Sequence, residues 1–194
     1  MNVTQNNVTE QPTWSLRTHP LRSDIRLLFL AALIVFIITV LIGIVNGQRI
    51  LQLSGDVILT HVHSGTIGWI TLSVFAISLW LFGSDKAIPA HHPFIRWSSI
   101  IATVFVPLYI LAFLSGNFIA RAVLGVPVLA VMAAFFGWVI YRSGKVRIGV
   151  AHLAILASLL TLVLGALLGV LLQFQFAPSS VLSGRGPIKF SSGA

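Results

Sequence analysis

Five long apolar runs dominate this chain of 194 residues. A bilayer core about 30 Å thick needs about 20 helical residues to cross it, at 1.5 Å of rise per residue, and every run approaches or exceeds that length. The sequence therefore predicts an all-α, multi-pass transmembrane helix bundle with five spans. The runs occupy residues 25–45, 57–82, 97–114, 123–141 and 148–176.

The composition excludes several other classes of protein. Hydrophobic residues make up 57% of the chain and charged residues 8%, and a soluble domain of this size needs more charge on its surface. The formal net charge is +8, but the basic residues stand in short loops and form no continuous face, so we expect no nucleic-acid partner. The absence of Cys excludes disulfides, iron–sulfur clusters, thiolate zinc sites and a CxxCH haem attachment.

The distribution of Lys and Arg predicts the orientation in the membrane. With five spans, the polar tail of residues 1–24 shares one side with the second and fourth loops. That side carries Arg17, Arg22, Arg26, Lys86, Arg96, Arg142, Lys145 and Arg147. The other side carries Arg49, Arg121, Arg185 and Lys189. Because basic loops stay in the cytoplasm, we expect the N-terminus inside and the polar tail of residues 177–194 outside.

Aromatic residues support the same orientation, and the spans themselves lack the charges of a transporter. Trp and Tyr gather at membrane interfaces, and four of them fall at the basic boundary: Trp80, Trp97, Trp138 and Tyr141. Asp24, Asp56 and Asp85 flank the spans instead of lying within them. A proton pump or ion transporter keeps carboxylates or Lys at depth, so transport by this chain alone is not expected.

Two histidines in the second run are the main candidates for chemistry. His61 and His63 are two positions apart, about 200° around a helix, so a regular helix cannot aim both at one metal ion. His61 shares its face with Ser64, Gly65 and Gly68, a smooth strip that would admit either another helix or a flat macrocycle. The equally simple interpretation is that both histidines are hydrogen-bonded packing residues.

The first run followed by HVHSGTIGWITLSVF resembles the first two helices of the haem-copper oxidase superfamily's catalytic subunit. It is closer still to short bacterial membrane proteins related to that subunit, which carry an H-x-H-x-x-x-x-G-W pattern. The resemblance covers roughly residues 25–83. It implies that His63 is an axial ligand of a haem b, and that the chain lies in a bacterial or archaeal cytoplasmic membrane.

The chain also departs from that family. Its third and fourth runs contain no His, so the histidines that hold a second haem and copper are missing, and the active-site Tyr has no counterpart. We therefore do not expect the chain alone to be a complete enzyme. A second haem ligand is also missing, because His152 lies at the opposite end of its span from His63. Gly165 and Gly169 form a GxxxG pair, which predicts close helix packing.

Three functions remain open from the sequence. The first is a haem b-binding component for electron transfer or gas sensing, with His63 and His61 as metal-ligand candidates and Gly65 and Gly68 beside the macrocycle. The second is a non-catalytic subunit that stabilises a membrane enzyme. The third is a copper site formed by His61, His63 and Asp56, if the helix starts after His63. In each case the partners are the lipid bilayer and either other membrane subunits or a homo-oligomer.

Overall fold

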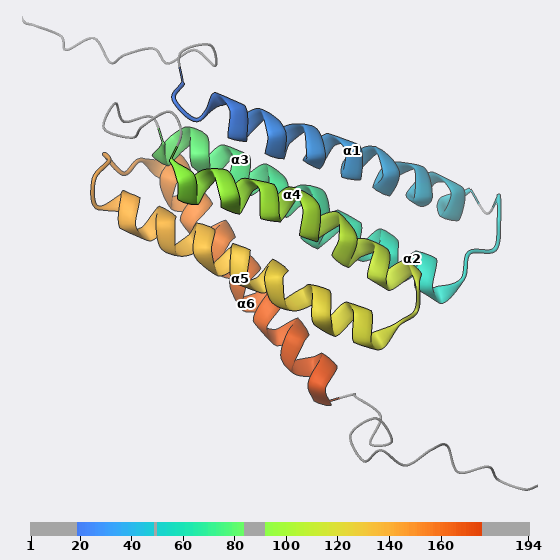
Figure 1. Ribbon diagram of the computed structural model, residues 1–194. Coiled ribbons are helices and arrows are strands. Elements are labelled where there is room, and N and C mark those ends of the chain that lie inside the picture. Colours follow the sequence, from blue (N-terminus) through green and yellow to red (C-terminus); the bar gives the residue numbers. More distant parts are fainter. Residues whose placement is uncertain (1–18, 49, 84–91, 176–194) are drawn as a thin grey trace, which may run out of the picture.

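The computed structural model describes residues 19–48, 50–83 and 92–175, with side chains described up to residue 172. Most of the two predicted tails lies outside these residues, as do Asp85 and several of the basic residues that predict the orientation. The described part is helical and contains no strand. Its elements are α1 (Arg22–Gly47), α2 (Gly55–His63), η1 (Ser64–Ile70), α3 (Thr71–Phe82), α4 (Pro93–Leu114), α5 (Phe118–Ser143) and α6 (Val150–Gln175) (Figure 1).

The five predicted spans are confirmed. The segments α2, η1 and α3 follow one another without a break and form the second span, while α1, α4, α5 and α6 form the others. The fourth span starts earlier than the apolar pattern predicts, at Phe118, because Asn117 caps it. The Asn117 Oδ1 atom accepts hydrogen bonds from the backbone N–H groups of Ile119 (2.9 Å) and Ala120 (3.1 Å). Arg121 is thereby brought into the first turn of α5.

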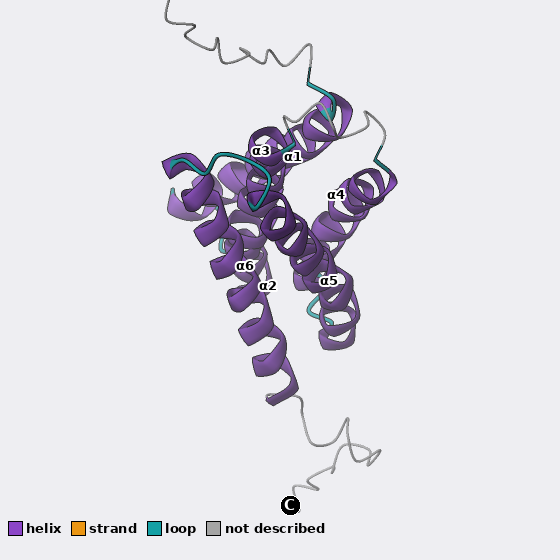
Figure 2. Ribbon diagram, turned by 90° about the vertical axis from the view of Figure 1, so that its left-hand side faces the viewer, coloured by secondary structure: helices purple, strands orange, loops and turns teal. Residues whose placement is uncertain are grey.

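Successive spans run in opposite directions, and α6 is inclined to the rest (Figures 1 and 2). The segments α1, η1 and α3 pack together, α4 packs against α5, and α6 packs against α3 and α5. We call the end where α1 begins and α3 finishes the His19 end, and the opposite end the Arg121 end. α6 diverges from its neighbours toward the Arg121 end (Figures 1 and 2).

The outer surface of the bundle is apolar. Only 22% of the most apolar window of α1 and 11% of that of α6 is buried, which leaves many large aliphatic side chains exposed. The interior is closed by aromatic and aliphatic contacts, including Phe75 and Phe135, whose rings stack at 4.0 Å. A surface of this kind is stable in lipid, which solvates apolar side chains, so the fold is that of an integral membrane protein.

A π-helical stretch interrupts the second span. In η1 the turns are wider than in an α-helix, and such turns are frequent near functional sites. Gly68 lies within it, where a Cβ atom would come within 2.7 Å of a Val35 methyl group on α1 and within 2.8 Å of the Ile110 side chain on α4. The absence of a side chain at Gly68 therefore lets three spans meet closely.

Each end of the bundle is tied by one ion pair between described residues. At the His19 end, Asp24 on α1 accepts a 3.0 Å bond from Arg96 on α4, and the Asp24 side chain is only 4% exposed. At the opposite end, Asp56 on α2 accepts a 2.9 Å bond from Arg121 on α5. These carboxylates lie at the ends of their spans, as the sequence predicts for both.

Candidate functional site

A cavity of about 360 Å³ opens between the second span, α4, α5 and α6 in the half of the bundle toward the Arg121 end. It exists because α6 inclines away from its neighbours there. Its volume lies within the range of small-molecule sites, and its walls are mainly aliphatic, as in most such sites. Its apolar lining includes Leu59, Ile67, Val128, Leu129, Val170 and Leu172.

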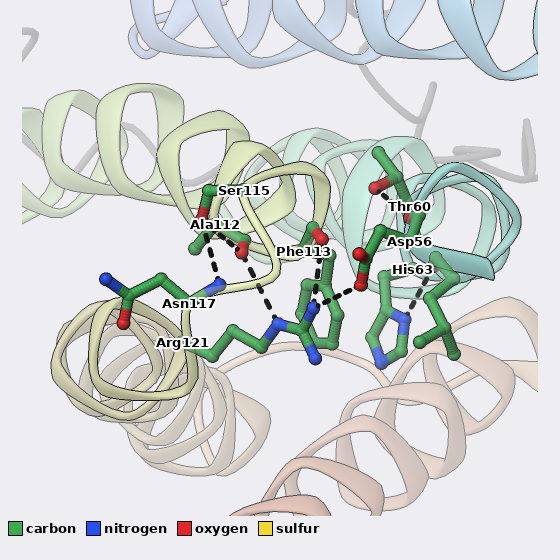
Figure 3. A network of polar contacts seen from close by, with 9 residues as sticks. Asp56, Thr60, His63, Ala112, Phe113, Ser115, Asn117 and Arg121 are labelled. Atoms are coloured by element: carbon green, nitrogen blue, oxygen red, sulfur yellow. Dashed lines mark hydrogen bonds and ion pairs between the residues drawn. The ribbon is translucent and has the colours of Figure 1, made fainter. Parts of the chain in front are cut away.

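His63 is the one histidine that lines this cavity among the described residues. Its Nδ1 atom lies 2.8 Å from the Leu59 carbonyl oxygen, which can only accept, so Nδ1 carries the proton. In the neutral ring Nε2 then bears the free lone pair. The ring also stacks on Phe113, with centroids 3.6 Å apart and planes 19° apart, and it extends across the cavity toward α6 (Figure 3). These two contacts fix both the tautomer and the direction of the ring.

Arg121 places a positive charge beside the same ring system. Its Nη2 donates to Asp56 Oδ1 (2.9 Å) and to the Phe113 carbonyl (3.0 Å), and its Nε donates to the Ala112 carbonyl (3.4 Å). The guanidinium carbon lies 4.8 Å from the centre of the Phe113 ring (Figure 3). Phe113 therefore contacts two of the polar residues that line the cavity, His63 and Arg121.

Sequence reasoning missed Arg121 and Phe113 as site residues. The apolar pattern placed Arg121 in a loop, and nothing distinguishes Phe113 from the other aromatic residues of the spans. One signal was available: Asp56 and Arg121 fall on the same predicted side of the membrane and have opposite charge. A pair of this kind at two span ends is a reason to expect contact between those spans.

Gly165 and Gly169 of α6 form an open wall of the cavity. A Cβ atom added at either glycine would meet nothing within 4 Å. The close helix packing predicted for this GxxxG pair is therefore not present among the described residues. A second cavity of about 230 Å³ shares His63, Ile67 and Gly165 with the first, so the free space continues along α6 past the histidine.

The other predicted site residues lie on a different face. The Nδ1 atom of His61 is 3.0 Å from the carbonyl oxygen of Thr39 on α1, so the two histidines point to different neighbours, as the helical spacing predicts. Gly65 approaches the Thr39 side chain, and Gly68 packs against α1 and α4. Of the two uses considered for the small-residue strip, the structure shows the close approach of another helix. Of the four predicted site residues, His61, His63, Gly65 and Gly68, only His63 lines the cavity.

The described residues contain no group of three or more His, Cys, Asp or Glu side chains that could hold a metal ion. The copper alternative required a helix that starts after His63, whereas α2 starts at Gly55. His152 lies at the His19 end, where its Nδ1 accepts a 3.2 Å bond from Gly149 N–H and its ring meets the Phe82 ring edge-on at 5.0 Å. It is thus far from His63 along the bundle axis.

Comparisons of this chain with protein-family models, with curated proteins and with solved structures found no match. The resemblance of the His61–Trp69 motif to the haem-copper oxidase superfamily therefore stays a sequence-based hypothesis. The function has to be argued from the geometry of the cavity itself.

Proposed function

We propose that this chain is a haem b-binding integral membrane protein in which the Nε2 atom of His63 is the iron ligand. One observation carries the proposal: Nδ1–H of His63 is bonded to a backbone carbonyl while Nε2 is available on the cavity side. A metal-binding histidine characteristically donates its other N–H to such an acceptor, because this bond sets the tautomer and the ring orientation.

The residues around the cavity suit a haem. The macrocycle is flat and apolar, and the aliphatic walls with the side-chain-free surface at Gly165 and Gly169 match those properties. Haem also carries two propionates, and the Arg121 guanidinium is a suitable partner for a carboxylate, as its bond to Asp56 illustrates. A bound haem b would supply one-electron redox chemistry and a site that binds a diatomic gas.

Among the residues that the structure describes, no second histidine lines either of the two joined cavities, so these residues offer the haem one imidazole ligand. Because α6 lies across the cavity from His63, the structure favours a haem held within one protomer over a haem clamped between two copies. We infer a role in gas sensing or electron transfer as one component of a membrane assembly. The distribution of basic residues supports an orientation with the Arg121 end outside the cytoplasm.

The proposal is tested by the absorbance of protein purified from haem-replete cells. Wild type is expected to show a Soret band with one haem per chain and to bind carbon monoxide. His63→Gly should lose the band, and added imidazole should restore it by occupying the vacated position. His61→Ala and His152→Ala are the matched controls and should keep the band.

Three results would contradict the assignment. Retention of haem by His63→Gly would exclude this ligand, and one haem per two chains would favour the clamped arrangement between copies. Folded wild-type protein that is purified from haem-replete cells and shows no Soret band would exclude the haem function altogether. The accessory-subunit interpretation would then stand.

A further inference from the structure

A separate apolar groove follows the contact between α1 and α3, starting near the His19 end. It consists of a hollow of about 260 Å³ with Arg26 and Trp80 in its walls and a hollow of about 230 Å³ with Phe36 and Trp69 in its walls. Phe29 lines both, so the two hollows follow one another along α1. Arg26 and Phe36 are ten positions apart, about 15 Å of helix, or half of a hydrocarbon core about 30 Å thick.

The groove has a positive charge at one end and apolar walls elsewhere. Arg26 is exposed, and none of the ion pairs between described residues includes it. The nearby carboxylate of Asp24 is already bonded to Arg96 and is buried. Arg22 lies one turn earlier on the same helix, and i and i+4 positions share a face. This end of the groove therefore attracts an anion.

Trp80 marks the depth of the charged end. It lies near the end of α3, and its indole ring stacks on His19, with centroids 5.0 Å apart and planes 22° apart. Trp side chains are typical of the level of lipid headgroups, whereas Phe36 and Trp69 at the other end of the groove lie deeper in the span. Arg26 is thus placed at headgroup depth, and the apolar walls are placed at acyl-chain depth.

We propose that this groove is a binding site for an anionic phospholipid, with one acyl chain between α1 and α3 and the phosphate group held by Arg26. The length of the groove matches the part of an acyl chain that lies in one leaflet. The Arg26 guanidinium, which forms no ion pair with another described residue, favours a headgroup of net negative charge over a zwitterionic headgroup, whose own ammonium offsets the phosphate. This site is independent of the His63 cavity.

The test measures quenching of Trp fluorescence by lipids that carry bromine on their acyl chains. A variant with Trp14, Trp97 and Trp138 replaced by Phe keeps only Trp69 and Trp80, the two tryptophans of the groove. It is reconstituted in two sets of vesicles. One set contains brominated phosphatidylglycerol, and the other contains the same fraction of brominated phosphatidylcholine. Quenching is expected to show about fivefold tighter binding of the anionic lipid, the effect of one charge near the membrane surface.

Three substitutions in that background decide the role of the charge. Arg26→Gln should reduce the preference for phosphatidylglycerol to near onefold, and Arg26→Lys should largely keep it. Arg147→Gln, which removes an exposed positive charge before α6, should leave the preference unchanged. Equal quenching by both lipids in the starting variant would overturn the proposal, as would an unchanged preference in Arg26→Gln. Protection of both tryptophans from either lipid would overturn it in favour of a second copy of the chain.

Discussion

At the scale of single residues, Arg121 links α5 to α2 and α4 at its end of the bundle. Its side chain is only 16% exposed, and it bonds two backbone carbonyls at the end of α4 as well as Asp56. Asp56 is 48% exposed, so water supports its charge when the pair is broken. The bonds to carbonyl groups, more than the ion pair, should therefore determine how much Arg121 contributes to stability.

This argument predicts unequal effects of removing the two partners. Arg121→Met should lower the free energy of unfolding by about 2 kcal/mol, because two carbonyls and a carboxylate lose a charged donor. Asp56→Asn should lower it by less than about 1 kcal/mol, as expected of an exposed ion pair. Unfolding of the two variants in mixed micelles provides the measurement. Equal losses would show that the ion pair is the dominant contact.

At the scale of elements, the inclination of α6 creates the cavity, and its glycines keep the space open. Gly165→Leu is predicted to fill the space opposite His63 and to weaken haem binding about tenfold or more. It should cause little loss of thermal stability, because a Cβ atom at this position meets nothing within 4 Å and the side chain extends into free space. Haem titration and thermal unfolding are measured together. Gly137→Leu is the control, since Gly137 on α5 is exposed and also has nothing within 4 Å. Similar haem affinity in the two variants would place the haem elsewhere.

His19 is a buried histidine that packs the segment before α1 against Trp80 of α3. Its Nδ1 accepts the Leu21 N–H (3.1 Å) and its Nε2 donates to the Trp80 carbonyl (3.3 Å), so the ring is neutral. Burial lowers the pKa of His19 below its ordinary value of 6.5, although the bond to Trp80 acts in the opposite direction. The folded protein therefore resists protonation of this ring.

Stability should consequently fall in acid. The unfolded chain takes up the proton of His19 near pH 6.5, before the folded protein does, so the contribution is complete above pH 6.5 and declines as the pH falls below it. The melting temperature of wild type should drop between about pH 7.5 and about pH 5.5 by more than that of His19→Gln, which does not titrate. Parallel pH profiles would exclude His19 as the titrating group.

At the scale of the whole molecule, the proposed orientation decides which compartment the cavity lies nearest. A phosphatase reporter that is active only outside the cytoplasm is expected to be active when fused after Ala194. The same reporter inserted after Gly144, in the turn between α5 and α6, should be inactive. The opposite pair of results would show that the orientation is inverted, with the Arg121 end in the cytoplasm. Activity at both positions would contradict the five-span topology.

The sequence by itself determined the number and approximate limits of the spans. A helix in lipid must be apolar over about 20 residues whatever its neighbours are. Each span can therefore be recognised from its own segment of the sequence. Helical periodicity likewise separated His61 from His63, because the angle between two positions of one helix does not depend on packing. These features are local, and the structure confirms them.

Only the tertiary structure decided which histidine meets a cavity. The spacing predicts that His61 and His63 point in different directions. It does not predict that α1 covers His61 or that a cavity lies beside His63. In lipid, the side of a helix that faces its neighbours is as apolar as the side that faces the bilayer, so hydropathy does not identify the partners. The inclination of α6, the open GxxxG pair and the entry of Arg121 beside Phe113 all follow from contacts between distant segments, which no single segment specifies.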